Sequence, residues 1–432
     1  MQRNDTIAAI STPAGVGGIA VIRISGADAY AIAMSHLSAT ELPPRKAVYC
    51  RFDDIDDIVA TYYPTGYSGE PTVELSCHGS QYVQQAILNA LVESGARLAE
   101  AGEFTMRAFL NGRLNLSQAE AVADLIDAAT PAQHRLAVSQ LRGSYAQKLK
   151  ELRQQLLDLT SLLELELDFS QEDVEFADRS QLHHLLSTLN AQLTTLIESF
   201  SLGNALKRGI PVAIVGAPNV GKSTLLNALL GDDRAIVSAI PGTTRDTIEE
   251  TLTIDGITFR IIDTAGLRLT DDTVEALGVE RSRKAVDDAT VVLYLHDSTQ
   301  LWREPDIDLK GKKAILVTTK ADLPHPTPQT SHLSISAKTG EGLDALKAAM
   351  VGAVRGELTA SDTLVSNPRH YEALLRVEES LRRVEHGLND GTPTDLVAVD
   401  LRDALYHLGT ITGEVTNNEL LGNIFSRFCV GK

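Results

Sequence analysis

The segment Gly216-Ala217-Pro218-Asn219-Val220-Gly221-Lys222-Ser223 constrains the fold of this chain more than any other feature. It follows a continuous apolar run, Pro211–Val215, and precedes a run with helical spacing, Thr224–Leu230. It fits G-x-x-x-x-G-K-[ST] at every fixed position, in the strand–loop–helix context that a phosphate-binding loop requires. The glycines let backbone N–H groups converge on phosphate, and the start of the helix adds partial positive charge. We therefore expect a doubly wound α/β domain, with the Lys222 amine on the β- and γ-phosphates and the Ser223 hydroxyl on Mg²⁺.

Three further motifs follow in the order and at the spacing of G proteins. Asp263-Thr264-Ala265-Gly266 ends an apolar run, where its aspartate suits Mg²⁺ coordination through water and its glycine N–H suits the γ-phosphate. Thr319-Lys320-Ala321-Asp322 follows another apolar run, and its aspartate would accept hydrogen bonds from guanine. Ser336-Ala337-Lys338 would present a backbone N–H to the base. The ordered set resembles the small GTPase-like superfamily and predicts binding of GTP and GDP. The expected nucleotide-binding residues are Asn219, Val220, Gly221, Lys222, Ser223, Thr224, Asp263, Thr264, Ala265, Gly266, Thr319, Lys320, Ala321, Asp322, Ser336, Ala337 and Lys338.

The first residue of the base-reading motif departs from the superfamily pattern, because Thr319 stands where asparagine is usual. Threonine lacks the amide that asparagine uses for bridging, so we expect weaker nucleotide binding. Asp322 is retained, so we expect the choice of guanine to survive.

The catalytic machinery of Ras-like proteins is incomplete in this chain, because Leu267 stands where a glutamine would orient water. Asn219 and the segment Gly242–Asp246 resemble the potassium-dependent GTPases instead. That resemblance implies a K⁺ ion in the position of an arginine finger, with Thr244 as a second Mg²⁺ ligand. A residue that only forms a turn is the alternative interpretation of Asn219. The implied potassium ligands are Asn219, Ser238, Ile240 and Thr243, in a nucleotide-binding loop that also contains Ala239, Pro241, Gly242 and Thr244.

The chain divides into four segments by the texture of its sequence. Residues 1–117 contain short strand-like runs separated by glycine-rich turns, which predicts an α+β domain. Residues 118–207 and 355–432 repeat leucine at spacings of three and four, which predicts a helical bundle. The economical interpretation is one helical domain interrupted by an inserted G domain at 208–354, and hence a multidomain α/β and α+β protein.

Individual elements are predicted within these segments. Ile19–Ile24 and Thr72–Ser76 read as strands, and Val83–Val92 reads as a helix. Ser117 with Glu120 three residues later is a capping-box pattern that predicts a helix start. The longer helical runs are Leu141–Leu167, Leu182–Leu196, Tyr371–Leu388 and Leu396–Leu408.

Charge and cysteine content bound the compartment and the partners. With 57 acidic and 39 basic residues, a net charge of −18, the chain should not coat DNA, RNA or anionic membranes non-specifically, and any RNA contact would be local. The start, Met1–Asp5, lacks the apolar region of a signal peptide, and no apolar stretch approaches the length of a membrane span. Cys50, Cys77 and Cys429 are too few for a disulfide framework and indicate a reducing compartment. We expect a cytoplasmic protein with no membrane or DNA partner.

Matches in every segment resemble one family. The switch-like segments Asp263–Arg268 and Val274–Arg281 and the final residues Phe428–Lys432 closely resemble the bacterial tRNA-modification GTPase family MnmE (TrmE). The C-terminal pattern C-[IV]-G-K is particularly specific. Further matches lie at Phe109–Leu114, Ala119–Ala121 and Asp124–Ile126.

This resemblance implies a folate site in the N-terminal domain. The domain is similar to folate-binding aminomethyltransferase modules, and would bind 5-formyltetrahydrofolate or a related one-carbon folate and form a homodimer. Motif matching places Arg23, Glu74, Arg113 and Lys432 in that site. Arg113 differs in type, because the family often has lysine there, so charge is kept while geometry is not. From the residues alone, Arg23 is a strand-end surface charge and Glu74 an exposed strand position.

Two residues are implied by the family as catalytic. Glu275 matches the glutamate proposed as general base or water-positioner, against the alternative of an ordinary acid in the first turn of a helix. Cys429 would be a nucleophile if it docks at the folate pocket. Cys77 and His78 suggest a Cys–His pair, but neighbours on a strand point to opposite faces, so we expect both to be structural.

The family resemblance implies a K⁺-stimulated GTPase that helps to install the carboxymethylaminomethyl group at C5 of the wobble uridine of certain tRNAs. It would act with the FAD-dependent partner MnmG (GidA), in a heterotetramer or larger complex, and GTP hydrolysis would move the G domains. Two alternatives stay open. One is a potassium-loop regulatory GTPase of ribosome assembly, which would carry a basic RNA-binding appendage. The other is a folate-dependent aminomethyltransferase with an attached switch.

Overall fold

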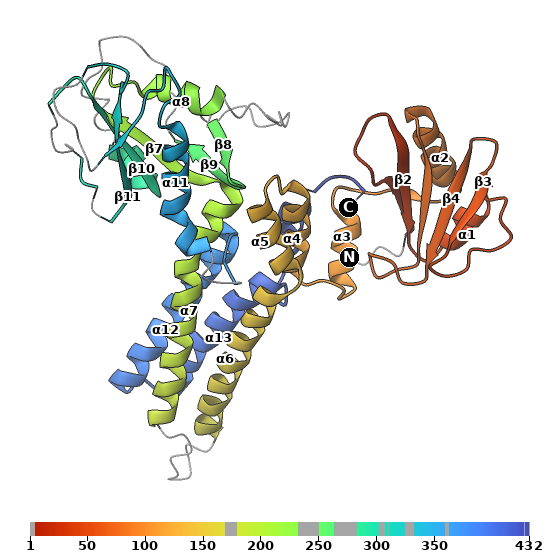
Figure 1. Cartoon of the computed structure of the whole chain (residues 1–432). Coiled ribbons are helices and arrows are strands. Elements are labelled where there is room, and N and C mark those ends of the chain that lie inside the picture. The colour runs from red at the N-terminus through yellow and green to blue at the C-terminus, as the bar shows by residue number, and fades with distance from the viewer. Residues whose placement is uncertain are drawn as a thin grey trace. The chain divides into compact units, whose positions relative to one another are not determined.

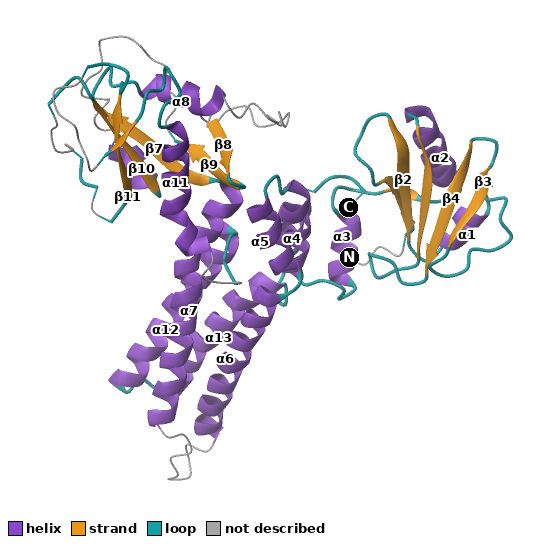
Figure 2. Cartoon of the chain, viewed as in Figure 1, coloured by secondary structure: helices purple, strands orange, loops and turns teal. Residues whose placement is uncertain are grey.

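The computed structural model describes residues 5–168, 179–231, 250–262, 283–301, 307–309, 311–324, 332–358, 363–426 and 428–431. The chain forms two compact units. The first comprises residues 1–126, 140–185 and 379–432, and the second comprises 127–139 and 186–378. Each unit combines one six-stranded sheet with helices, and Figure 2 distinguishes the two kinds of element by colour.

The sheet of the first unit is mostly antiparallel. Its strand order is β3-β4-β5-β2-β1-β6, and only the β1–β6 pair is parallel. The helices α1 (Ala29–Met34) and α2 (Gln81–Glu93) pack on one face, so apolar residues alternate along the strands. The strands are β1 (Ile7–Ile10), β2 (Gly17–Ser25), β3 (Ala47–Phe52), β4 (Asp56–Tyr63), β5 (Thr72–Gly79) and β6 (Arg97–Leu98). The predicted α+β texture, its two strands and its helix are confirmed.

The helices of the first unit join segments that are distant in sequence. α6 (Ser144–Asp168) and α13 (Thr394–Thr412) run side by side (Figure 1), and Arg402 pairs with Glu164 across 238 residues at 2.8 Å. The apolar face of α6 buries leucines at spacings of three and four, which confirms the predicted helical pattern. Those leucines are Leu149, Leu152, Leu156, Leu159 and Leu163. The shorter helices of this unit are α3 (Glu103–Leu110), α4 (Leu116–Asp127) and α14 (Asn418–Phe425). The long helices α7 (Arg179–Arg208) and α12 (Pro368–Asp390) contribute residues to both units, and α5 (Pro131–Leu141) lies mostly in the second.

The predicted capping box of α4 is wrong by two residues. The side chain of Asn115 accepts a 2.8 Å hydrogen bond from the Gln118 N–H, and the Gln118 side chain accepts one of 3.1 Å from the Asn115 N–H. Ser117 lies inside the helix, buried, and donates its hydroxyl proton to Asn115. The reciprocal geometry of a capping box is present, with asparagine and glutamine in its two positions.

The second unit contains the predicted doubly wound sheet. Its order is β12-β11-β10-β7-β9-β8, parallel throughout except for the edge pair β8–β9. α8 (Lys222–Gly231) and α11 (Leu343–Leu358) pack on one face, and the helical residues 283–288 pack on the other. The strands are β7 (Ile210–Gly216), β8 (Glu250–Ile254), β9 (Ile257–Ile261), β10 (Val291–Asp297), β11 (Lys313–Thr319) and β12 (Leu333–Ser334).

Candidate functional site

The phosphate-binding loop joins β7 to α8, as the sequence predicts. Gly216 ends β7 at a φ of +150°, and a Cβ atom there would lie 2.5 Å from the Leu295 carbonyl oxygen of β10. Only glycine fits this position, because the loop turns directly over the neighbouring strand. Asn219 has a φ of +60° and is exposed, in a turn that asparagine tolerates better than most residues. Among the described residues, its amide has no hydrogen-bond partner.

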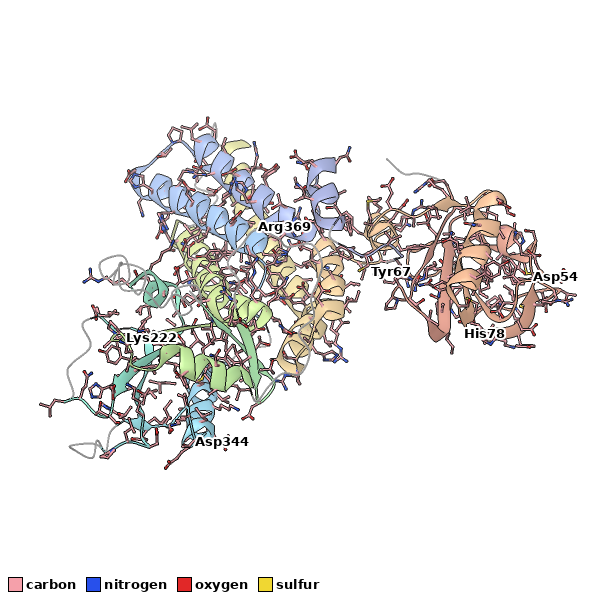
Figure 3. All side chains as sticks on the ribbon, turned by 90° about the horizontal axis from the view of Figure 1, so that it is seen from above. Asp54, Tyr67, His78, Lys222, Asp344 and Arg369 are labelled. Carbon is pink, nitrogen blue, oxygen red and sulfur yellow. The ribbon has the colours of Figure 1, made fainter. Side chains whose placement is uncertain are left out.

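The side chain of Lys222, labelled in Figure 3, folds back over the loop. Its Nζ atom donates to the carbonyl oxygens of Gly216, at 2.8 Å, and Ala217, at 2.9 Å. Burial lowers the pKa of this amine, because it is partly removed from water at the start of α8. A phosphate at the loop would supply the negative charge that these carbonyl dipoles supply only in part.

The two base-reading motifs meet at the same edge of the sheet. The Ala321 N–H donates to the Ile335 carbonyl, at 3.0 Å, so the segments after β11 and β12 are joined by backbone. The Ser336 hydroxyl, fully buried, donates to Asp322 Oδ1 at 2.8 Å. This bond orients the Asp322 carboxylate, which is itself exposed to solvent. The structure thus brings Asp322 and the Ser336–Lys338 segment together, as expected for a guanine site.

Thr319 bridges the base-reading motif to the phosphate-binding loop. It is 3% exposed, and its hydroxyl donates to the carbonyl oxygen of Val220 at 2.7 Å. The carbonyl oxygen of His296 lies 3.1 Å from the same hydroxyl. Threonine thus bridges the two loops through its hydroxyl instead of an amide, because the loops approach closely enough for it to reach. Weaker nucleotide binding stays a prediction.

Several expected site residues lie outside the described residues. They are Ser238, Ala239, Ile240, Pro241, Gly242, Thr243, Thr244, Asp263, Thr264, Ala265, Gly266, Glu275 and Lys432. Ser223 and Thr224 are described and occupy the first turn of α8.

The Arg23–Glu74 pair lies on the sheet of the first unit. Arg23 of β2 and Glu74 of β5 are direct cross-strand partners. The Nε and Nη2 atoms of Arg23 lie 2.9 and 2.7 Å from the same oxygen of Glu74. The guanidinium carbon also lies 5.6 Å from the ring centres of Tyr67 and Phe104, within cation–π range. Both charged side chains are less exposed than surface positions would be, so neither is a plain surface charge.

The sheet face that carries this pair is open beyond it. A row of cross-strand neighbours runs Tyr49, Val59, Ser76, Val21 on that face. Tyr49 is 73% exposed and Val59 is 36% exposed. An apolar, aromatic strip therefore lies beside the Arg23–Glu74 pair, with a charged group at its border.

Arg113 lies at the border of the same region. A Cβ atom added at Gly69, two residues after Tyr67, would lie 3.1 Å from Cγ of Arg113, and Asn111 donates to the Ser68 carbonyl at 2.9 Å. The loop that contains Tyr67 is thus held by the turn that contains Arg113. The Arg113 side chain itself is exposed.

The C-terminal segment docks on the first unit. Val430 forms a β-bridge with Ala101, and the Ser11 hydroxyl donates to the Gly431 carbonyl at 3.1 Å. Gly431 has a φ of +95°, and a Cβ atom there would lie 2.3 Å from the Ile10 carbonyl oxygen. The Cys429 carbonyl accepts a 3.4 Å bond from the Gly102 N–H, at the turn that leads into α3 and Phe104. The thiol of Cys429 is exposed while its backbone is held.

The other two cysteines are buried and lie among apolar neighbours. Burial raises the pKa of the Cys77 thiol to about 11, with a further contribution from Asp56. His78 points to the opposite face, where its ring lies 2.7 Å from Asp56. The expectation that Cys77 and His78 make no direct pair is confirmed.

The sequence patterns missed one turn that contacts the Thr319–Asp322 segment, Asp297–Thr299 at the end of β10. Asp297 is 8% exposed and pairs with Lys320 at 2.6 Å. A sequence signal for Asp297 was available. The continuous apolar run of β10 ends in this acid, as the runs of the two motif-bearing strands end in their motifs.

Comparison with known proteins gives two family matches that together span almost the whole chain. Residues 116–429 match a family model described as the MnmE helical domain, and residues 6–113 match the N-terminus of the GTP-binding protein TrmE. The tRNA modification GTPase MnmE of Christiangramia forsetii is 46% identical, and the alignment covers 100% of both chains. MnmE of Parabacteroides distasonis is 48% identical, with 99% of this chain and 100% of that protein covered.

Among solved structures, the G domain of the T. maritima FeoB iron transporter is 28% identical and aligns with 34% of this chain. The alignment covers 98% of the FeoB chain, and the TM-score is 0.25, a value from which no functional argument follows. No helix within the described ranges is long and apolar enough to cross a membrane.

Proposed function

Since the chain belongs to the MnmE family of tRNA modification GTPases, we propose that it forms the carboxymethylaminomethyl group at C5 of the wobble uridine of certain tRNAs. It is a GTP hydrolase acting in tRNA modification. In this proposal the G domain hydrolyses GTP with Mg²⁺ and K⁺, and the N-terminal domain supplies a one-carbon group from 5-formyltetrahydrofolate. The four-part division at residues 117, 207 and 354 remains part of the proposal.

The observation that carries the GTPase part is the junction of three loops at one sheet edge. Thr319 holds the phosphate-binding loop and Ser336 orients Asp322, with bonds of 2.7 and 2.8 Å. A carboxylate with two acceptor oxygens matches the N1–H and N2–H donors of guanine. GTP is therefore the nucleotide that this arrangement suits.

The ion sites rest on residues of the phosphate-binding loop. Mg²⁺ would be held by the hydroxyls of Ser223 and Thr244, which match the hard oxygen donors that this ion prefers. K⁺ would be held by Asn219 together with the loop Ser238–Thr243. Asn219, exposed in a left-handed turn, supports this role because its amide has no hydrogen-bond partner among the described residues. When bound, K⁺ would offset the negative charge that builds up between the β- and γ-phosphates. Glu275 would position the attacking water.

The folate proposal rests on the open sheet face. A folate carries a flat heteroaromatic ring and an acidic tail, and the strip Tyr49–Val59 with Arg23 offers apolar contact and a cation on one surface. Glu74 and Arg113 border the region, and Lys432 would complete it. Cys429 would act there as a nucleophile, since the bridge between Val430 and Ala101 fixes its backbone.

The same open face supports a homodimer, because an exposed aromatic strip gains stability when a second copy covers it. The FAD-dependent partner MnmG (GidA) would join the dimer in a heterotetramer or larger complex with tRNA. With a net charge of −18 on this chain, tRNA contact would be local and shared with that partner. Free cysteines at all three positions are consistent with a cytoplasmic location.

Mass analysis of the wobble uridine in cells lacking this protein tests the proposal. We expect the carboxymethylaminomethyl group to disappear, to return with the wild-type gene and to stay absent with Lys222→Ala. Lys148→Ala, on the surface of α6, is the matched control and should restore it. Unchanged modification in the deleted cells, with accumulation of immature ribosomal subunits, would instead support the ribosome-assembly alternative.

A further inference from the structure

A turn outside all of the nucleotide-binding motifs holds the base-reading loop. The turn is Asp297–Thr299, which begins at the last residue of β10. Asp297 Oδ2 lies 2.6 Å from the Nζ atom of Lys320. The other oxygen of Asp297 accepts bonds from the backbone N–H and hydroxyl of Thr299, at 2.9 and 2.7 Å. One oxygen of the Asp297 carboxylate thus binds the motif and the other binds within the turn.

Ser298 fixes the backbone of the same motif. Its N–H donates to the Thr319 carbonyl at 3.1 Å, and its hydroxyl donates to the Lys320 carbonyl at 2.9 Å. Together with the Lys320 ion pair, the turn makes three contacts with two consecutive motif residues. These contacts are internal to the second compact unit.

The contacts matter because Lys320 is held in an uncommon conformation. Its φ is +59°, in the left-handed region that non-glycine residues rarely adopt. Such a conformation persists only where the surroundings impose it. Asp322 follows two residues later, so the direction of its carboxylate depends on the backbone at Lys320.

Asp297 is suited to impose that conformation because it is buried and ionised. Its side chain is 10% exposed, against 35% for that of Lys320. Burial opposes ionisation, but the bonds from Lys320 and Thr299 outweigh it, and the pKa of Asp297 lies below its ordinary value. The carboxylate of Asp297 is therefore negatively charged at neutral pH.

We propose that Asp297 is a positioning residue for guanine recognition, which acts through Lys320 to preform the direction of the Asp322 carboxylate. It deepens the proposed function, since it rests on Asp322 reading the base. Preforming the loop removes an ordering cost from binding, so the gain is greatest for the nucleotide that makes the most bonds to Asp322. Guanine offers two donors to a carboxylate, and hypoxanthine offers one.

The test compares GDP and IDP binding to the full chain carrying Asp297→Asn. We expect the Kd for GDP to rise about tenfold and the Kd for IDP to rise less than about threefold, so that the preference for guanine falls. For GTP hydrolysis, kcat at saturating GTP should be unchanged, while the KM for GTP should rise. Asp344→Asn, labelled in Figure 3 and exposed on α11, removes the same charge from the same unit and should change neither constant.

A double-mutant cycle decides whether Asp297 acts through Lys320. The double variant Asp297→Asn, Lys320→Met should have the same Kd for GDP as whichever single variant binds GDP less tightly. This is expected because the two substitutions remove the same interaction. Full additivity would overturn the proposal. A parallel loss of GDP and IDP affinity with a lowered melting temperature would also overturn it, since that is general destabilisation. If the wild-type chain shows no preference for GDP over IDP, the guanine-site proposal itself fails, which is a separate result.

Discussion

The hydroxyl of Thr319 reaches the carbonyl oxygen of Val220 across 99 residues of sequence, at 2.7 Å. One bond thereby connects the segment that we propose reads the base with the loop that we propose binds the phosphates. Because both ends are almost fully buried, water does not compete for either atom. The bond therefore holds the two loops at a fixed separation.

Removing this hydroxyl should weaken nucleotide binding as a whole. For Thr319→Val we expect the Kd for GDP to rise about five- to thirtyfold, since a buried carbonyl loses its donor at a cost of about 1–2 kcal/mol. Thr319→Ser keeps the hydroxyl and should bind within about threefold of the wild type. Thr319→Asn should also bind within about threefold, because the bridge already exists. A fluorescent GDP titration measures all three, and wild-type affinity in Thr319→Val would contradict the expectation.

Potassium dependence can be separated from nucleotide binding at Asn219. GTP turnover by the wild type should rise at least about tenfold when Na⁺ is replaced by K⁺ at constant ionic strength, as expected of a cation in the arginine-finger position. Asn219→Ala should lose this rise while its Kd for GDP changes less than about threefold. The exposed Asn89→Ala in α2 is the matched control. Equal turnover in the two salts would remove the potassium assignment.

Docking of the C-terminal segment should matter for modification and not for hydrolysis. Gly431→Val places a side chain against the Ile10 carbonyl and strains a left-handed backbone, so we expect the segment to undock. Modified wobble uridine should fall at least about tenfold, as with Cys429→Ser, while GTP turnover stays within about twofold. Gly422→Ala, in open space on α14, is the control. Full modification by Gly431→Val would show that the docked state is dispensable.

The three thiols should differ sharply in reactivity. Iodoacetamide at pH 8 should label Cys429 and leave Cys50 and Cys77 unmodified, because burial raises the pKa of both. At about 11, the pKa of Cys77 leaves almost no thiolate at this pH. Intact-mass analysis should find one added group, and three after unfolding in guanidinium. A labelled Cys77 in the folded chain would contradict the packing of the sheet.

Acid should destabilise the N-terminal sheet through a buried ion cluster. A hydrogen bond from Arg97 lowers the pKa of Asp5, and bonds from Arg97, Glu100 and Arg107 outweigh the burial of Glu103, so that its pKa also lies below the ordinary value. Depressed folded-state values mean that this stability is present above about pH 4 and is lost as the pH falls through them.

A substitution inside the cluster checks this assignment. Glu103→Gln removes the negative charge and replaces one of the two oxygens that together accept four bonds, at a side chain only 2% exposed, and should cost about 3–5 kcal/mol of unfolding free energy at pH 7. Its stability should then depend less on pH between 2.5 and 5 than that of the wild type. Denaturant unfolding at several pH values measures both effects. The exposed Glu41→Gln is the control, and an unchanged acid profile in Glu103→Gln would refute the assignment.

Sequence pattern predicted the strands and loops that carry the G-protein motifs because each motif has a fixed place between a strand and the next element. Spacing alone placed Asp322 beside Ser336 correctly, although the two segments are joined only in the folded sheet. Spacing could not assign a role to Asp297, because many acids follow an apolar run. The role becomes visible only when the strand order places β10 between β7 and β11.

The errors have local physical causes. The capping box was assigned to Ser117 because serine and glutamate fit the usual pattern, while Asn115 and Gln118 make the same bonds with amides. The bond from Thr319 to Val220 could not be read from the sequence, because the distance between the two loops decides whether a hydroxyl reaches. Cross-strand neighbours such as Arg23 and Glu74 lie 51 residues apart, so their pairing needs the register of the sheet.

The pairing of α6 with α13 has a consequence for synthesis on the ribosome. Arg402 is made 238 residues after its partner Glu164. At a synthesis rate of roughly 5–20 residues per second, the leucine face of α6 stays uncovered for about 10–50 s before α13 has been made. The sheet of the second unit is translated during that interval and is complete before α13 emerges. The nascent chain should therefore be a chaperone client at α6, and a pause between these helices should lengthen its exposure.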